Sequence, residues 1–215
     1  MNQWLTGRPG LRLLDRVGRA GPADGILARS GAEAFAALHS GFRPEDVFLC
    51  APFDAEAVQL QDRCRFVAGG LDDLLFLERL AEGSGKEGLF RVGLRLQAPD
   101  LPPVENAVPP AALPQHAREI RLLRHLTVRG CFFSGDLSEV HGEALGRFFR
   151  ARYETAKQMT VALPCTMPYL CFENSVSAIG KNAELHPETL DACLRALDIV
   201  VMQNETAFYA KFFLS

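Results

Sequence analysis

The chain has 215 residues, of which 48% are hydrophobic, and its formal net charge at pH 7 is −3. This length and composition are enough to bury a sizeable core. Because the sequence has no basic block, nucleic acid is not an expected partner. No apolar run reaches the roughly 18 residues that a membrane helix needs, and proline and glycine interrupt the N-terminal stretch where a signal peptide would be apolar.

The six cysteines are scattered, form no CxxC pair and in several cases lie within apolar, strand-like runs. This pattern favours buried thiols in a reduced, cytoplasmic protein over a disulfide framework. The histidines and cysteines also lack the spacing of a metal site, so no metal is expected.

The first half of the chain alternates helix-like and strand-like segments. Apolar residues at helical spacing predict helices, and short apolar runs between them predict strands. The predicted helices are 10–18, 31–42, 54–63 and 71–85, and the predicted strands are 24–30, 45–50, 64–68 and 89–97. This alternation indicates an α/β fold with a parallel sheet, in which right-handed crossovers place the helices outside.

The second half breaks this alternation. Residues 98–116 contain six prolines, which predict an extended loop. The elements predicted next are a helix at 117–126, a strand at 127–133, a helix at 138–159 and a candidate strand at 160–164. Because the pattern then becomes β-rich, we expect an α/β barrel-like domain at 1–159 and a small antiparallel β-rich segment at 160–215.

Four stretches in the same order resemble the fold-type III pyridoxal-phosphate (PLP) decarboxylases, which include the diaminopimelate, ornithine and arginine decarboxylases. The stretches are LRLLDRVGRAGPADGILARSGAEAFAALHSGFRPEDVFLCAPFDAEAV, LDDLLFLERLAEGSGKEGLFRVGLRLQ, LTVRGCFFSGDLSEVHGEALGRFF and YLCFENSVSAIGKNAELHPETLDACLRALDIVVMQNETAFY. The resemblance implies a partial or shortened TIM-like barrel of the alanine racemase type, followed by a small C-terminal β domain.

The resemblance also implies candidate site residues. Glu33 falls on the family's Ser-x-x-Glu motif, Arg95 on an arginine that ends a barrel strand, and Cys171 on an active-site thiol that acts across the dimer interface. From the residues alone, Glu33 also suits a first-turn helix charge, Arg95 a salt bridge at the rim and Cys171 a buried strand thiol.

Two further candidates come from the last two stretches. Gly135 lies in a strand-turn-helix layout that often holds a phosphate. The tyrosine of the family's last motif aligns with Phe208, and Tyr209 is adjacent to it.

The departures from the family pattern concern PLP itself. In the family a lysine at the end of the first barrel strand carries PLP, whereas no lysine here precedes Lys86. The histidine that stacks on the pyridine ring aligns with Phe133, and the phosphate-binding serine aligns with Asp136, whose charge would repel a phosphate. PLP chemistry needs an amine, an acid at the ring nitrogen and donors for the phosphate. We therefore expect no bound cofactor and no aldimine.

Two interpretations follow, and whether the chain is an enzyme is open between them. In the first, the chain is a degenerate relative of these decarboxylases that acts as a non-catalytic binding or regulatory subunit, with a small amino-acid-like ligand. In the second, it is an active PLP-dependent amino-acid decarboxylase (a lyase) or racemase-type enzyme whose lysine or missing strands come from another chain.

The strand count bears on assembly. The five or six predicted barrel strands fall short of the eight that close such a barrel, so edge strands would be exposed, with DGILARS the most exposed of them. The family also forms dimers that pair the barrel of one chain with the β domain of the other. We expect a homodimer, or a heterodimer with a decarboxylase-like chain.

Overall fold

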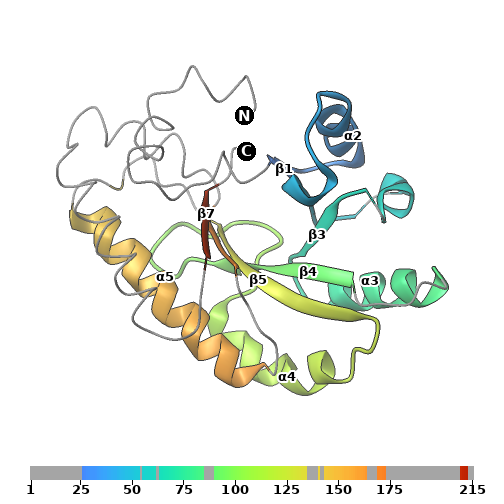
Figure 1. Cartoon of the computed structure of the whole chain (residues 1–215). Coiled ribbons are helices and arrows are strands. Elements are labelled where there is room, and N and C mark those ends of the chain that lie inside the picture. Colours follow the sequence, from blue (N-terminus) through green and yellow to red (C-terminus); the bar gives the residue numbers. More distant parts are fainter. Residues whose placement is uncertain are drawn as a thin grey trace.

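The computed structural model describes residues 26–53, 55–61, 63–84, 90–134, 140, 143–163, 169–172 and 209–212. Within these residues the strands form one seven-stranded sheet whose spatial order is the order of the chain (Figure 1). Every neighbouring pair in the sheet is parallel. The strands are β1 (Ile26–Ala28), β2 (Val47–Cys50), β3 (Arg65–Ala68), β4 (Phe90–Gln97), β5 (Leu126–Ser134), β6 (Tyr169–Phe172) and β7 (Tyr209–Phe212).

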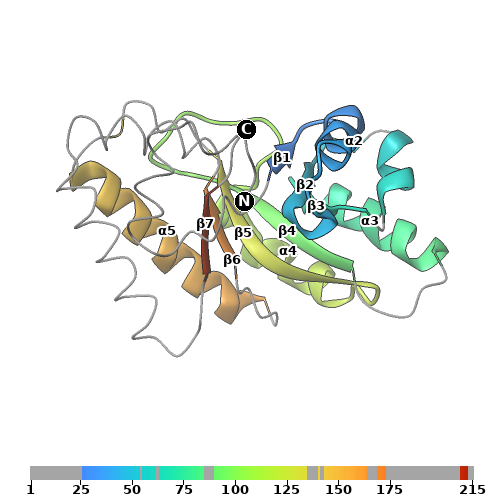
Figure 2. The ribbon, with the colours of Figure 1, turned by 45° about the horizontal axis from the view of Figure 1, so that its top comes forward.

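In the described residues, an α-helix follows each of β1, β3, β4 and β5, and the 3-10 turn η3 follows β2. Helices α3, α4 and α5 follow the outside of the sheet in both views (Figures 1 and 2). The helices are α2 (Gly31–His39), α3 (Leu71–Gly83), α4 (Leu113–Arg121) and α5 (Glu143–Ala162), with 3-10 turns η2 (Pro44–Asp46), η3 (Ala55–Leu60) and η4 (Pro110–Ala112). None of the helices in the described ranges is long and apolar enough to cross a membrane.

The two faces of the sheet bury different residues. The outer face packs against the helices in one large cluster, in which Leu94 and Phe133 of the sheet join Leu74, Leu77 and Tyr153 of α3 and α5. The inner face has a smaller cluster, whose members are Leu27, Phe48, Cys50, Val67 and Phe132.

The inner cluster shows that the sheet curls. Phe48 of β2 and Phe132 of β5 have ring centroids 5.3 Å apart, although β3 and β4 lie between their strands. On a flat sheet those backbones would be about 14 Å apart. The curl turns the inner face into a barrel-like interior that contains this apolar cluster.

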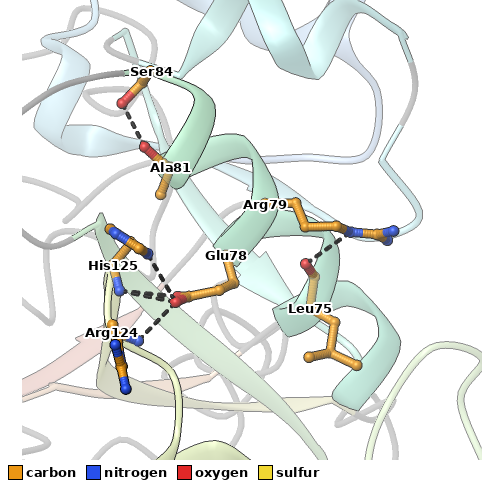
Figure 3. A network of polar contacts seen from close by, with 7 residues as sticks. All are labelled: Leu75, Glu78, Arg79, Ala81, Ser84, Arg124 and His125. Carbon is orange, nitrogen blue, oxygen red and sulfur yellow. Dashed lines mark hydrogen bonds and ion pairs between the residues drawn. The ribbon is translucent and has the colours of Figure 1, made fainter.

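The amino ends of the strands are fixed by a polar network around Glu78 of α3 (Figure 3). Its carboxylate accepts hydrogen bonds from the backbone N–H of Arg124 at 2.7 Å and of His125 at 3.0 and 3.1 Å, and its Oε1 lies 3.0 Å from Nδ1 of His125. Burial alone would raise the pKa of Glu78, but these hydrogen bonds lower it below its ordinary value. The network joins α3 to the residues that lead into β5.

Several predicted boundaries need correction. The predicted helix 54–63 is the 3-10 turn η3. The helix predicted at 117–126 runs over Leu113–Arg121. It can begin before Pro114, because backbone N–H groups in the first turn of a helix have no intrahelical acceptor, so proline costs no hydrogen bond there. The candidate strand at 160–164 is wrong, since α5 continues to Ala162 with Tyr153, Ala156 and Met159 buried at helical spacing.

The antiparallel C-terminal piece is also a wrong prediction for the strands that the structure describes. Strand β6 pairs parallel with β5, and β7 pairs parallel with β6, so both continue the same sheet. A four-residue apolar strand such as Tyr169–Phe172 reads the same in either pairing, so its sequence gives no direction. The domain boundary at Met159 stays a prediction, and the predicted helix 10–18 lies outside the described residues.

Candidate functional site

The carboxyl ends of the parallel strands form the candidate site, because ligands in such sheets bind at that edge. Three features meet there: the start of α2, Gly69 directly after β3, and the end of β4 with the loop that follows it. We call residues 98–108 the strap.

Arg95 is a buried cation at this edge, with 9% of its surface exposed. It pairs in register with Phe132 of the inner cluster, and paired residues on parallel strands share a face, so Arg95 belongs to the interior. Its Nη1 donates to the carbonyl oxygen of Glu105 at 3.1 Å. A guanidinium in this position can bind a carboxylate or a phosphate.

The strap is folded around the side chain of Gln97. The amide Nε2 donates to the carbonyls of Ala98 at 2.8 Å, Leu101 at 3.3 Å and Pro102 at 3.1 Å, and Oε1 accepts from the N–H of Val104 at 2.7 Å. At its far end Val108 forms a bridge with Leu96. The prolines of this loop are therefore held in one defined conformation.

An ion pair fastens the strap to the outer layer. Asp100 accepts from Nη2 of Arg152 on α5, whose side chain is only 2% exposed. The Arg152 guanidinium also lies 4.7 Å from the ring of Phe148 and 5.8 Å from that of Phe133. Burial lowers the pKa of Arg152 to about 10, although the group stays charged at neutral pH.

The strap crosses from β4 to the end of β3 and lies directly on Gly69. A Cβ atom on Gly69 would be 2.2 Å from the carbonyl oxygen of Asn106, whereas one on Gly70 would meet nothing within 4 Å. The Gly69 N–H donates to Asp73 Oδ2 at 2.8 Å. Burial raises the pKa of Asp73, and this hydrogen bond opposes the rise.

Glu33 lies at the same edge and forms a helix cap. Its backbone N–H donates to Ser30 Oγ at 3.2 Å, and its carboxylate accepts from the N–H of Arg29 at 2.7 Å. This is similar to a capping box, except that the carboxylate accepts from the residue before the N-cap, and it stabilises the first turn of α2. A contact of Glu33 with a ligand stays a prediction.

Cys171 lies level with Arg95 across the sheet, in a line of residues paired between neighbouring strands that we call the register row. Arg95 pairs with Phe132, Phe132 with Cys171, and Cys171 with Lys211. Tyr209 pairs with Tyr169 in the row two residues earlier. Gly135 lies outside the described residues, so its predicted contact with a ligand has no structural counterpart here.

Lys211 is a candidate that the sequence analysis missed. The available signal was strand alternation, because Lys211 follows Tyr209 by two residues and so shares its face. Without the register, nothing in the sequence connects this lysine to Arg95.

Phe133 does not occupy the position that its alignment with the ring-stacking histidine implies. It belongs to the outer cluster, close to Arg152, while Phe132 lies on the inner face. The register shifts between Val92 and Gly93, so that Arg129 is an extra residue in β5. Such a bulge changes which residues face inward and leaves no clear mark in the sequence.

The strands β1 to β5 are cationic and contain no lysine, histidine, aspartate or glutamate. Their arginines are Arg65, Arg91, Arg95 and Arg129. The described residues also contain no group of three or more histidine, cysteine, aspartate or glutamate side chains placed to hold a metal. These five strands can thus attract an anion, but they offer no amine or carboxylate for covalent or acid–base chemistry.

Comparison with solved structures decides the fold. Diaminopimelate decarboxylase from Helicobacter pylori, complexed with L-lysine, is similar at a TM-score of 0.64 and 15% identity, over 89% of this chain and 51% of that one. The Paramecium bursaria Chlorella virus arginine decarboxylase bound to agmatine gives a TM-score of 0.65 at 12% identity, over 88% and 51%. This chain has the fold of the fold-type III PLP-dependent decarboxylases.

A shorter protein shares the fold as well. PipY of Synechococcus elongatus PCC7942 with PLP bound is similar at a TM-score of 0.54 and 14% identity, over 96% of this chain and 98% of that one. No family model matches the sequence, and no curated protein matches it either. The predicted shortened, TIM-like α/β fold is confirmed, and the chain spans about half the length of the two decarboxylases.

The fold implies PLP, so its requirements can be set against the residues present. Arg95 suits an anionic group, but Phe48 and Phe132 fill the inner face and strands β1 to β5 supply no lysine or ring-nitrogen acid. Those strands do not fit PLP as a covalent cofactor.

Proposed function

We propose that this chain is a non-catalytic, degenerate member of the PLP-decarboxylase fold that acts as a binding or regulatory subunit for a small anionic, amino-acid-like ligand. The observation that carries the proposal is Arg95, a buried cation at the ligand-binding edge of strands that contain no acid, base or amine. Such a site supports recognition of an anion, and strands β1 to β5 offer no amine or carboxylate for decarboxylation.

The contact between Arg95 and the strap is the one that an anionic ligand could replace. The Arg95 guanidinium now donates to the neutral carbonyl of Glu105. A hydrogen bond between two charged groups is roughly twice as strong as one between neutral groups, so a carboxylate or phosphate could replace this carbonyl. Burial of the site strengthens that preference, because a buried pair is screened little by salt.

The solved structures support two sources for such an anion. One related protein is complexed with L-lysine, which carries a carboxylate, and PipY is described with PLP, which carries a phosphate. The shared chemistry is a small organic molecule with one terminal anionic group.

Isothermal titration calorimetry with matched probes tests the proposal. L-lysine is compared with cadaverine, its decarboxylated form, and pyridoxine 5′-phosphate with pyridoxine; neither pyridoxine compound has an aldehyde. We expect the anionic member of at least one pair to bind about tenfold tighter, and Arg95→Gln to abolish that difference. Equal affinity within both pairs, or an unchanged preference in Arg95→Gln, would contradict the proposal.

A second function is favoured by one observation, the presence of Lys211 in the register row of Arg95 and Cys171. In that alternative the chain is an active PLP-dependent amino-acid decarboxylase or racemase-type enzyme, with PLP as its cofactor. When bound, PLP supplies an electron sink for the substrate carbanion. The trapping experiment in the Discussion separates the two functions.

We further propose that the chain assembles as a homodimer, or with a decarboxylase-like chain, in the cytoplasm. Strand β1 ends the sheet order and pairs only with β2 within the described residues, which is the arrangement of an edge. In the described part of the chain, Cys50, Cys64 and Cys131 are not disulfide-bonded, which is consistent with a reducing compartment. Light scattering at low micromolar concentration tests assembly, and a stable monomer of 23.6 kDa would contradict it.

A further inference from the structure

We infer that the strap competes with the anionic ligand for Arg95. The anion site then opens only when the turn at Glu105 and Asn106 moves away from the carboxyl ends of the strands, which we call the mouth. This inference rests on the proposed function, because it names the regulation of the same site. It goes further in giving the chain a closed state and an open state.

The strap is anchored at both ends, and between the anchors lies the turn at Glu105 and Asn106, which we call the cover. Its first half is held by Gln97 and by the Asp100–Arg152 ion pair, and its end by the Leu96–Val108 bridge. Between these anchors, the Glu105 carbonyl faces Arg95 and the Asn106 carbonyl lies against Gly69. The cover can therefore lift while both ends of the strap stay attached.

Among the described residues, few contacts hold the turn at Glu105 and Asn106 in place. The side chains of Glu105 and Asn106 are exposed, so little apolar burial fixes them. Asn106 has φ 55°, in the left-handed region, which asparagine tolerates better than most residues but still at some cost. Segments with little burial are those that open locally at low cost.

In the closed state the main chain of the strap lies in close contact with Gly69. Because the clash of an added Cβ would be with main-chain atoms of Asn106, no side-chain rotation could relieve it. The two adjacent glycines thus differ sharply: a methyl group at Gly69 must push the strap away, and a methyl group at Gly70 touches nothing.

This difference provides the experiment. Gly69→Ala and Gly70→Ala are each compared with the wild type, in the full chain, for affinity toward L-lysine and pyridoxine 5′-phosphate. In parallel, brief digestion by a glutamate-specific protease reports opening through cleavage after Glu105. We expect Gly69→Ala to be cut several-fold faster and to bind the preferred anion about fivefold tighter, since apparent affinity rises with the open fraction.

Gly70→Ala should match the wild type in both measurements. A second variant, Asn106→Gly, removes the left-handed cost without adding volume, so it should stabilise the closed strap, slow cleavage and weaken anion binding by about threefold. Asn106→Gly also keeps the inference testable if Gly69→Ala fails to fold.

The outcomes separate this inference from the proposed function. If the wild type prefers an anion but Gly69→Ala is cut faster without binding tighter, the strap is not a competitor and the anion site stands. Unchanged cleavage in both variants would equally overturn the strap inference. If the wild type shows no anion preference, the proposed function itself fails.

Discussion

The two ends of the sheet differ in the charged group that each contains and in the hydrogen bonds of that group. At the amino end, the Glu78 carboxylate receives the backbone N–H groups of Arg124 and His125 and lies beside the His125 ring (Figure 3). At the carboxyl end, the Arg95 guanidinium donates to a main-chain carbonyl of a surface strap. The first arrangement satisfies a charge with donors fixed by the fold, while in the second a cation contacts a carbonyl that we propose an anion can replace.

This contrast agrees with what is general in α/β barrels: residues at the amino ends of the strands stabilise the fold, and residues at the carboxyl ends bind ligands. Changes at the amino end should therefore alter the free energy of unfolding without altering ligand affinity. Changes at the mouth should do the reverse, unless they reach the buried anchor of the strap.

The anchor itself gives the largest expected effect. Arg152→Ala removes a buried side chain that packs on Phe133 and Phe148 and leaves Asp100 without this partner, so we expect a loss of about 3 kcal/mol in the free energy of unfolding. Arg150→Ala, at an exposed position of the same helix, should change it by less than about 0.5 kcal/mol. Urea denaturation measures both, and equal effects would show that the anchor is not structural.

At the amino end, Glu78→Gln should cost about 1 to 2 kcal/mol, because hydrogen bonds to a charged carboxylate are replaced by weaker ones. The pKa of Glu78 is lower in the folded chain than its ordinary value. Its stabilisation is therefore present above the unfolded pKa near ~4.3 and disappears as the pH falls through the folded pKa.

The difference between wild type and Glu78→Gln should thus shrink in acid, and affinity for the anionic probes at neutral pH should not change. Glu82→Gln is the matched control, since Glu82 is exposed on the same helix. A difference that grew toward low pH would contradict this account of the network.

A smaller, local effect is expected for thiol labelling at the mouth. We predict that Cys171, in the register row of Arg95, reacts at least tenfold faster in the native protein than Cys50, which is 2% exposed. Mass spectrometry of peptides after brief alkylation measures both rates. Should Cys171 react no faster than Cys50, the row does not border an accessible site.

The smallest expected signal is a null result with PLP. After incubation with PLP and reduction by borohydride, we predict no stoichiometric pyridoxyl-lysine on any peptide. Lys157, exposed on α5, serves as the control for surface modification. A stoichiometric adduct on Lys211 without one on Lys157 would contradict the expected absence of an aldimine and favour the alternative function.

Regular elements were predictable where burial is periodic. The strand predicted at 89–97 is Phe90–Gln97, and the helix predicted at 71–85 is Leu71–Gly83, because alternating and i, i+3 apolar residues define them. Helix α5 continues beyond its predicted end at residue 159 to Ala162. Thr160 and Val161 favour a strand locally, but they continue a helix whose buried face is already set by the preceding residues.

The site was predictable only in part. Arg95 at a strand end was found from the family pattern, yet its neighbours depend on pairing between distant segments. The bulge at Arg129 changes the inward residue from Phe133 to Phe132, and Gln97 organises the strap through contacts that no local pattern encodes. The proline-rich loop that was predicted as extended is folded around Gln97, and its Glu105 carbonyl contacts Arg95.

A crystal structure of the chain with pyridoxine 5′-phosphate or L-lysine, whichever binds tighter, would test the central claim most directly. We predict that the phosphate or carboxylate lies within hydrogen-bond distance of the Arg95 guanidinium, and that the Glu105 carbonyl has moved off it with Asn106 lifted from Gly69. An anion bound elsewhere, with the Glu105 carbonyl still 3.1 Å from Arg95 Nη1, would contradict both the binding site and its strap.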